Sequence, residues 1–127
     1  MILKRLKNWL NPPVYVRPAC LSDARRLTKS HVLSWQVTYR GYMPDSALDH
    51  IPSARWQARW ERYIEAGKDV LVVAKGRLII GFANFGPSRD HDLDSKRIAE
   101  LYGIYLHPAI PGHAPGNCFL VYMRHTA

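Results

Sequence analysis

The chain has 127 residues, of which 47% are hydrophobic, and its 18 Lys and Arg exceed its 10 Asp and Glu to give a net charge of +8. This length predicts one domain, and no apolar run approaches the roughly 18 residues that cross a bilayer. The positive charge favours an anionic partner, such as a phosphorylated ligand, an acidic substrate, nucleic acid or an anionic membrane, without choosing among them. The two cysteines, Cys20 and Cys118, have no CxxC spacing and are typical of free thiols in a reducing, cytoplasmic compartment.

Residues 1–13 are predicted to be a basic amphipathic extension ahead of the domain. The apolar face of the expected helix consists of Ile2, Leu3, Leu6, Trp9 and Leu10, and the polar face largely of Lys4, Arg5, Lys7 and Asn8. Pro12 and Pro13 end it, and it lacks the cleavage site of a signal peptide. Three interpretations stay open: binding to an anionic membrane surface, packing on the domain, or an extension without a role.

Residues 14–39 predict a short strand followed by a long helix. Residues 14–19 favour a strand with Arg17 pointing outward, and Ser22 is a good N-cap for a helix over residues 23–39. A stripe at helical spacing runs along this helix and consists of Ala24, Leu27, His31 and Trp35. His31 on such a stripe is more typical of a core histidine than of a catalyst.

Residues 40–66 predict a loop and a second helix. Glycine and proline are typical of a loop over residues 40–51, and Ser53 is expected to cap a helix over residues 54–66. The helix has an apolar face of Trp56, Trp60, Tyr63 and Ile64 beside a basic ridge of Arg55, Arg59 and Arg62. Such a ridge can bind nucleic acid, but it is more often a solvated helix face, so the case for nucleic acid is weak.

The next segment predicts a β-hairpin and a polar loop. The runs at residues 70–74 and 78–85 favour two strands joined at Lys75 and Gly76. The polar residues 88–97 include the possible metal ligands Asp90, His91, Asp92 and Asp94. Their spacing lacks the glycine and distal Glu of an EF-hand, so we expect a solvated loop and no metal site.

The most informative stretch is AELYGIYLHPAIPGHAPG, residues 99–116. It predicts a strand that ends at Leu106, a break at His107 and Pro108, and a loop with two glycines. The apolar residues 118–123 could then open a helix. A glycine-bearing loop ahead of a helix directs backbone N–H groups at one spot and favours an anion there. Taken alone, such a loop is more often a simple turn.

ELYGIYLHP followed by a glycine loop resembles the core motif of the GNAT N-acetyltransferase superfamily. Three further stretches fit in the same order: VRPA at residues 16–19, W-x-x-x-Y-x-G-x-x-P at residues 35–44, and VLVVAKGRLIIGFANFGP at residues 70–87. The resemblance implies an α/β (α+β) fold for residues 14–127, with a mixed, mostly antiparallel sheet flanked by helices. In this family a bulge splays the motif strand, acetyl-CoA pairs with its backbone, and loop amides hold the pyrophosphate.

The resemblance implies an acetyl-CoA-dependent N-acetyltransferase that acts on a primary amine of a small molecule, a peptide or a protein. The residues that would contact acetyl-CoA are Ile104, Tyr105, Leu106, Gly112, His113, Ala114, Gly116 and Asn117. Trp35, Tyr39 and Tyr42 would face the acceptor. Plain core packing explains Tyr39 and Tyr42 equally well, and it explains Trp35 better.

Acetyl transfer to an amine needs a base, because the nitrogen's lone pair must be free. Glu100 begins the motif strand, where the resemblance implies the catalytic carboxylate. An equally good alternative is a sheet-edge ion pair of Glu100 with Lys96 or Arg97. A backbone N–H near Tyr105 or Leu106 would stabilise the oxyanion that forms on the thioester.

The loop and tail depart from the family pattern. Pro111, Ala114 and Pro115 replace a Gln or Arg, a Gly and a residue with a backbone donor, and the C-terminal strands of the family are missing. A truncation, or a change of reading frame near residues 109–112, would produce this pattern. The alternative function is therefore a degenerate, non-catalytic GNAT-like remnant that binds a partner. An unpaired strand at residues 101–106 would also favour a homodimer.

Overall fold

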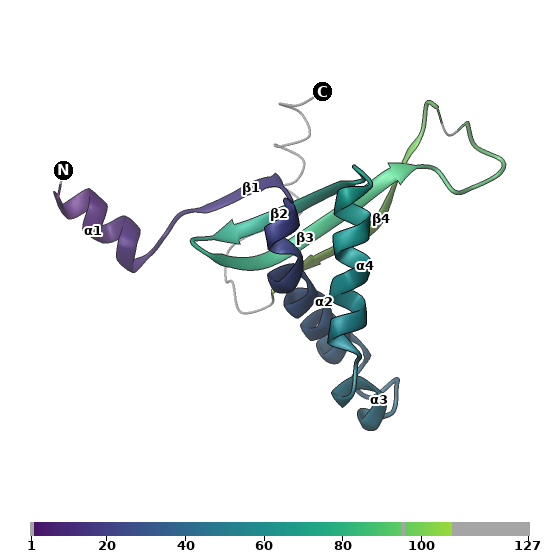
Figure 1. Ribbon diagram of the computed structural model, residues 1–127, viewed down its shortest axis with the longest axis horizontal. Helices are drawn as coiled ribbons and strands as arrows, with labels where there is room; N and C mark the ends of the chain where they lie inside the picture. The colour runs from purple at the N-terminus through teal and green to yellow at the C-terminus, as the bar shows by residue number, and fades with distance from the viewer. Residues whose placement is uncertain (1, 95, 108–127) are drawn as a thin grey trace.

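The computed structural model describes residues 2–94 and 96–107. Its elements in chain order are α1 (Ile2–Leu10), β1 (Val14–Pro18), the 3-10 helix η1 (Leu21–Asp23), α2 (Ala24–Tyr39), α3 (Asp45–Asp49), α4 (Ser53–Glu65), β2 (Asp69–Lys75), β3 (Leu78–Pro87) and β4 (Ala99–Leu106). The strands form a four-stranded sheet in the order β1-β2-β3-β4, and every neighbouring pair is antiparallel. Helices α2 and α4 lie side by side against this sheet (Figure 1). The fold class expected from the sequence is confirmed.

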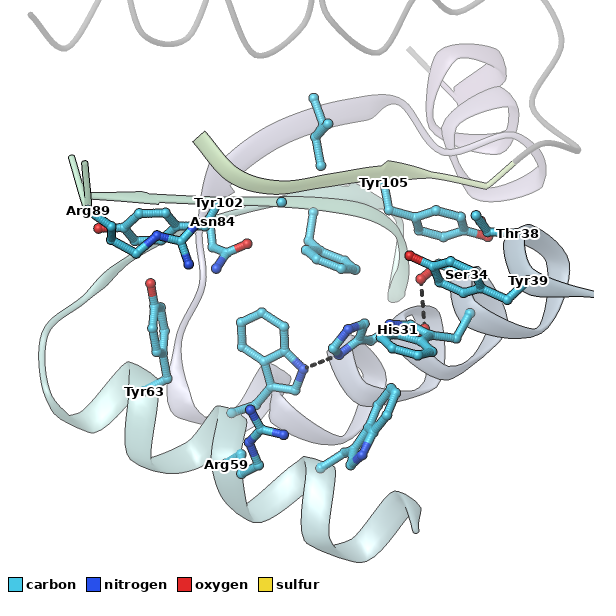
Figure 2. Close-up of a pocket in the computed structure, with 16 residues that line it drawn as sticks. His31, Ser34, Thr38, Tyr39, Arg59, Tyr63, Asn84, Arg89, Tyr102 and Tyr105 are labelled. Carbon is cyan, nitrogen blue, oxygen red and sulfur yellow. Dashed lines mark hydrogen bonds between the residues drawn. The ribbon is translucent and has the colours of Figure 1, made fainter. Parts of the chain in front are cut away.

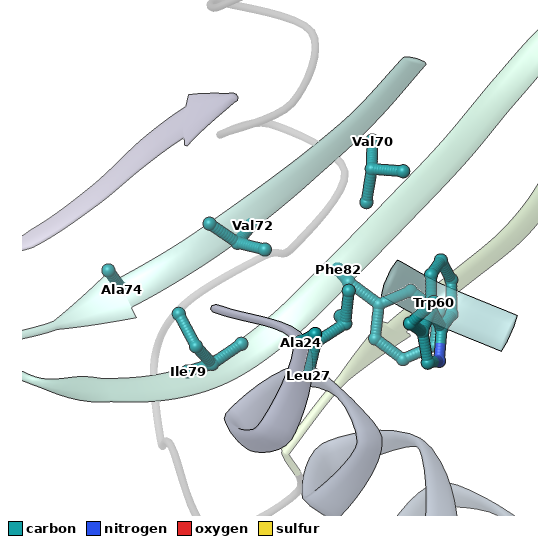
Figure 3. Close-up of a cluster of buried hydrophobic side chains, with 8 residues drawn as sticks. All are labelled: Ala24, Leu27, Trp60, Val70, Val72, Ala74, Ile79 and Phe82. Atoms are coloured by element: carbon teal, nitrogen blue, oxygen red, sulfur yellow. The ribbon is translucent and has the colours of Figure 1, made fainter. Parts of the chain in front are cut away.

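The main core lies between the sheet and the two long helices (Figure 3). Strand β2 alternates, so that Val70, Val72 and Ala74 face the helices while Leu71 and Val73 belong to a second cluster. The main cluster consists of Ala24, Leu27, Trp60, Val70, Val72, Ala74, Ile79 and Phe82. Full burial of one aliphatic side chain stabilises a fold by roughly 1.5–3 kcal/mol, so this cluster fixes how α2 and α4 sit on the sheet.

Strand β4 contains a β-bulge. Asn84 pairs with Gly103 and Phe85 pairs with Leu101, so Tyr102 is the extra residue in β4. Beyond the bulge the two strands approach closely, because a Cβ on Gly81 would lie 2.6 Å from the carbonyl oxygen of Tyr105. Within the described residues β4 is an edge strand. The bulge that the family resemblance implied is therefore present, and it lies at Tyr102.

Both predicted serine caps are wrong. The 3-10 helix η1 precedes α2, and the carboxylate of Asp23, not Ser22, accepts the backbone N–H of Cys20 at 2.8 Å. Helix α4 begins at Ser53 itself, whose hydroxyl donates back to the carbonyl of Ile51. The predicted loop at residues 40–51 contains the short helix α3. Serine is common at helix starts, but the residue that caps depends on backbone angles that the sequence pattern does not fix.

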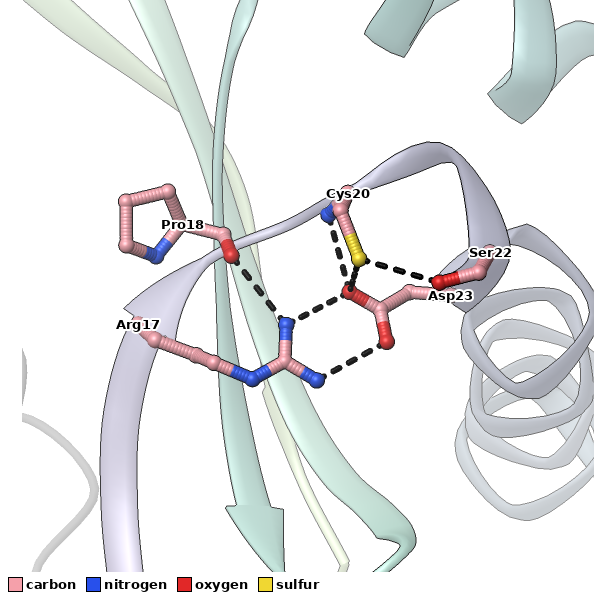
Figure 4. Close-up of polar contacts among 5 residues, drawn as sticks. All are labelled: Arg17, Pro18, Cys20, Ser22 and Asp23. Atoms are coloured by element: carbon pink, nitrogen blue, oxygen red, sulfur yellow. Dashed lines mark hydrogen bonds and ion pairs between the residues drawn. The ribbon is translucent and has the colours of Figure 1, made fainter.

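Arg17 and Asp23 form an ion pair where β1 leads into α2 (Figure 4). The guanidinium donates to both carboxylate oxygens, at 2.6 and 2.9 Å. The sequence predicted that Arg17 points outward into solvent. In the structure its side chain instead turns toward Asp23. Its hydrogen bonds hold the pKa of Asp23 at about 2, while burial works in the opposite direction. The pair ties the first strand to the helix that bears one wall of the site.

Helix α1 stands away from the sheet and the long helices (Figure 1). Its large apolar side chains are exposed, with Leu3 at 77% and Trp9 at 79%. Packing on the domain, one of the three interpretations of this segment, is therefore not what the structure shows. No helix in the described part of the chain has the length and apolar character needed to cross a membrane.

Candidate functional site

A pocket of about 700 Å³ opens between α2, α4 and the last two strands (Figure 2). Its walls are formed by side chains of α2 and α4 on one side and of β3 and β4 on the other. The residues that line it are His31, Ser34, Trp35, Thr38, Tyr39, Trp56, Arg59, Trp60, Tyr63, Phe82, Asn84, Arg89, Tyr102, Gly103, Ile104 and Tyr105. The bulged part of β4 thus forms one wall of this pocket.

His31 lies at the centre of an aromatic group. Its ring centroid is 4.6 Å from that of Trp56 and 5.4 Å from those of Trp60 and Phe82. The indole N–H of Trp60 donates to Nδ1 of His31 at 3.1 Å. Burial, helped by the charge of Arg59, lowers the pKa of His31 to about 4. The imidazole is therefore neutral at pH 7, and because Nδ1 accepts, its proton sits on Nε2. This confirms a boundary histidine, but one that also lines the pocket.

Two phenol groups of the pocket are buried without a hydrogen-bond partner in the described residues. These are the hydroxyls of Tyr63, on α4, and Tyr105, on β4. Burial raises the pKa of Tyr105, so this phenol stays protonated. An unsatisfied buried hydroxyl costs about 1–3 kcal/mol. A ligand that supplied a partner would recover part of that cost.

Arg89, Glu100 and Tyr102 form a polar cluster at one end of the pocket. The Arg89 guanidinium donates to Glu100 at 2.6 Å, and its carbon lies 4.2 Å from the centre of the Tyr102 ring. The backbone N–H of Arg89 also donates to Glu100, at 2.8 Å. These hydrogen bonds lower the pKa of Glu100. Arg89 faces the pocket, whereas Glu100 lies in a separate shallow hollow with residues of the loop after β3.

The structure brings together four of the predicted site residues. Trp35 and Tyr39 line the pocket from α2, and Ile104 and Tyr105 line it from β4. Of the others described, Leu106 packs against the second apolar cluster, Tyr42 is 87% exposed in the turn after α2, and Glu100 pairs with Arg89 in place of Lys96 or Arg97. The predicted loop residues Gly112, His113, Ala114, Gly116 and Asn117, and the helix expected at residues 118–123, lie outside the described residues.

Sequence reasoning missed several pocket residues. Arg89 and Tyr102 were not singled out, since their contacts join the segment after β3 to β4 across the sheet edge. Arg59 was assigned to a solvated ridge, and it does lie exposed, but at the rim of the pocket. The signal that could have found Tyr102 is its place in the motif strand, three residues before Tyr105. Arg89 carries no such signal.

The acidic side chains of the loop after β3 are the possible metal ligands that the sequence indicated. No group of three or more His, Cys, Asp or Glu side chains there could hold a metal ion. In the polar loop, Asp90 instead accepts the backbone N–H of Asp92 at 3.1 Å. The Asp94 side chain likewise accepts from Lys96. These carboxylates stabilise local turns.

Comparison with known proteins gives one relative in sequence. The chain is 36% identical over 93 residues to YuaI of Bacillus subtilis (strain 168), an uncharacterized N-acetyltransferase. The match covers 73% of this chain and 52% of that protein, so the chain spans about half the length of the curated relative it matches. No family model matches the chain.

Solved structures with the same fold are acetyltransferases. The putative acetyltransferase yncA of Salmonella typhimurium, solved with its cofactor acetyl-CoA, has a TM-score of 0.59 at 23% identity and is matched over 87% of this chain and 60% of its own. The PaiA N-acetyltransferase of Thermoplasma acidophilum, in complex with coenzyme A, has a TM-score of 0.66 at 18% identity. The match covers 90% of this chain and 71% of that protein. A GNAT-family acetyltransferase of Bacillus cereus has a TM-score of 0.53 at 18% identity. The match covers 87% of this chain and 62% of that protein.

These likenesses show that the chain has the fold of these acetyltransferases. The resemblance that the motifs indicated is confirmed, because the relative in sequence is an N-acetyltransferase and solved acetyltransferases, one of them described as GNAT family, share the fold.

Proposed function

We propose that this chain is an acetyl-CoA-dependent N-acetyltransferase that transfers an acetyl group to a primary amine. The observation that carries the proposal is the β-bulge at Tyr102 beside the aromatic pocket, in a chain with the GNAT fold. An amine in the pocket would lie next to the strand whose backbone faces the cosubstrate in this family. Acetyl-CoA supplies an activated acyl group, and the reaction forms an amide and releases the CoA thiol.

The described residues fit a cosubstrate on the outer side of β4. Edge strands present unpaired N–H and C=O groups, and β4 has no further neighbour among the described residues. We propose that the backbone at Ile104, Tyr105 and Leu106 pairs with acetyl-CoA, and that an N–H there stabilises the oxyanion. The roles of Gly112, His113, Ala114, Gly116 and Asn117 toward the pyrophosphate remain predictions.

Trp35 and Tyr39 are proposed to hold the apolar part of the acceptor. Their rings contact each other, with centroids 4.7 Å apart. Tyr42 would take part only if its turn closed over the pocket. Glu100 is proposed as the base, acting through water, and this role needs Arg89 to yield the carboxylate it now holds.

The Glu100→Gln variant distinguishes two roles of this carboxylate: catalytic base, or partner that only holds Arg89 in place. A base predicts that kcat falls by about 10²-fold or more and that the acid limb of the pH profile disappears. A carboxylate that only positions Arg89 predicts a higher KM with little change in kcat. The matched control is Asp90→Asn, which removes a nearby exposed charge outside the ion pair.

The test of the function itself is calorimetric binding of acetyl-CoA to the full chain, with dephospho-CoA and pantetheine as controls, followed by an amine panel. Micromolar binding that requires the pyrophosphate, with N-acetylated product, supports the transferase. Folded protein that binds none of these ligands overturns it. The second candidate is then a GNAT-like remnant that binds a partner, an alternative favoured by Pro111, Ala114 and Pro115 in the loop. An acceptor amine, a homodimer and a cytoplasmic location stay predictions.

A further inference from the structure

The wall of the pocket is aromatic and carries positive but no negative side chains. Among the described lining residues there is no Asp or Glu, whereas Arg59 and Arg89 are both present. The charge of Arg89 is balanced by its ion pair with Glu100. Arg59 has no ion-pair partner in the described part of the chain, and its charge reaches the ring of His31. The pocket therefore presents one unbalanced cation at its rim.

Several polar groups of the pocket can donate a hydrogen bond to a ligand. Because Nδ1 of His31 accepts from Trp60, the N–H of its neutral ring is on Nε2. The buried hydroxyls of Tyr63 and Tyr105 have no partner and can donate. Figure 2 places Tyr63 and Tyr105 toward opposite ends of the pocket, with His31 and Arg59 between them. These donors, together with Arg59 at the rim, match the oxygens of an anionic group.

We infer that the acceptor is an amine that also bears a carboxylate, of the amino-acid kind, whose apolar side chain packs against the aromatic wall. This inference rests on the proposed function. Arg59 binds the carboxylate at the rim, and the rings of Trp35 and Trp56 bind the side chain. A polycationic amine is disfavoured, because the pocket has no carboxylate among its described residues to balance the extra charge.

The test compares ligands of one shape and different charge. Phenylalanine, phenylalaninamide, phenethylamine and spermidine are titrated into the protein without acetyl-CoA, by calorimetry and by the fluorescence of the pocket tryptophans. Phenylalanine is expected to bind about fivefold to tenfold more tightly than its amide, as one charge-assisted contact at a partly exposed site allows. Equal or tighter binding of the amide, phenethylamine or spermidine overturns the inference.

Variants assign the preference to one side chain. Arg59→Gln is expected to abolish the difference between phenylalanine and its amide. Arg62→Gln removes a charge from the same helix but from a residue that does not line the pocket, and is expected to keep it. An unchanged preference in Arg59→Gln overturns the assignment. Since acetyl-CoA binding is measured separately, its failure would overturn the transferase while leaving this ligand preference readable.

A second inference concerns α1. Its exposed apolar residues, Ile2, Leu3, Leu6, Trp9 and Leu10, fall on one side of the helix. Lys4, Arg5 and Lys7 lie on the remaining side, and the helix has no acidic residue. We propose that α1 binds an anionic phospholipid bilayer, with the apolar side in the interface and the basic side toward the headgroups. Its separation from the sheet leaves that apolar side free for the membrane.

The test is co-sedimentation with vesicles of phosphatidylcholine alone or with phosphatidylglycerol. We expect binding at least about tenfold stronger to the anionic vesicles, lost in Leu6→Asp/Trp9→Asp and weakened in Lys4→Gln/Arg5→Gln/Lys7→Gln. The control, Arg55→Gln/Arg59→Gln/Arg62→Gln, removes as many charges from α4. Equal loss in the control, no preference for anionic lipid, or capture of α1 by a protein in place of lipid overturns the proposal. The α1 variants should keep the unfolding temperature, because α1 is apart from the core.

Discussion

The indole N–H of Trp60 and Nδ1 of His31 are 3.1 Å apart and join helix α4 to helix α2 at the pocket. This hydrogen bond exists only while His31 is neutral, because a protonated Nδ1 cannot accept. The pKa of His31 is lowered from 6.5 to about 4 by burial. The link between the helices is therefore intact at neutral pH and is lost in acid.

The first prediction is a loss of stability between pH 6.5 and pH 4. In that window the unfolded chain binds a proton that the folded chain does not, so the free energy of unfolding falls as pH falls. After allowance for solvent screening, we expect the free energy of unfolding to fall by about 2 kcal/mol across this window. Urea unfolding at several pH values measures it, and His31→Gln should flatten the profile in this window. A His31 pKa near 6.5 by NMR would contradict it.

The second prediction concerns the pair Arg17 and Asp23. Asp23→Asn is expected to cost about 2 kcal/mol, because the carboxylate is buried and the guanidinium is about two-thirds covered. Asp45→Asn is the matched control, since its pair with Arg40 is exposed, and it should cost less than about 0.5 kcal/mol. Both are measured by urea unfolding at pH 7. Equal effects would show that burial of the pair does not matter. The Asp23 contribution is lost as pH falls from 3.8 toward 2.

The third prediction tests the close approach of β3 and β4. In Gly81→Ala the new Cβ would meet the Tyr105 carbonyl oxygen at 2.6 Å and the Leu106 side chain at 2.8 Å. Because a backbone atom moves only with its whole strand, we expect the free energy of unfolding to fall by about 1–3 kcal/mol. In Gly103→Ala the new Cβ would meet only the side-chain oxygen of Asn84, at 2.9 Å. We therefore expect Gly103→Ala to lose less stability than Gly81→Ala, and thermal melts of the two variants measure the difference. A Gly81→Ala protein as stable as the parent would contradict the observed register.

The fourth prediction uses the unsatisfied phenol of Tyr105. Removing it in Tyr105→Phe should stabilise the free protein by about 1 kcal/mol, because the desolvation cost disappears. The same change should weaken ligand binding in the pocket if the hydroxyl serves the ligand. Tyr42→Phe, at a residue 87% exposed, is the control and should change neither quantity. A destabilised Tyr105→Phe protein would mean that the hydroxyl already has a partner.

Much of the scaffold could be predicted from the sequence. The long helices follow from the spacing of residues such as Leu27 and Trp60, and the hairpin from a β-branched run that turns at Gly76. These signals are local and repeat over many residues, so they survive without knowledge of the fold. The motif strand was placed by resemblance, and with it two of the pocket residues, Ile104 and Tyr105.

Apart from Trp35 and Tyr39, which the resemblance also placed, the rest of the site could not be predicted, because it depends on contacts between distant segments. Arg89 and Glu100 are 11 positions apart and meet only when β3 and β4 pair. The neutral state of His31 depends on burial and on the charge of Arg59, and its tautomer depends on the indole of Trp60, 29 positions away. Helix α3 is too short to leave a periodic pattern, and it interrupts a segment whose composition is typical of a loop.

The order of the sheet has a consequence for how the pocket is made. Strands that are neighbours in space are also consecutive in the chain, and the main core is built from residues between Ala24 and Phe82. Synthesis delivers the N-terminal part first, so a nascent chain that has emerged as far as β3 already holds every residue of that core cluster. The wall formed by β4 arrives afterwards. A ligand in the pocket can therefore stabilise the docking of the last strand, while the core forms without help from the ligand.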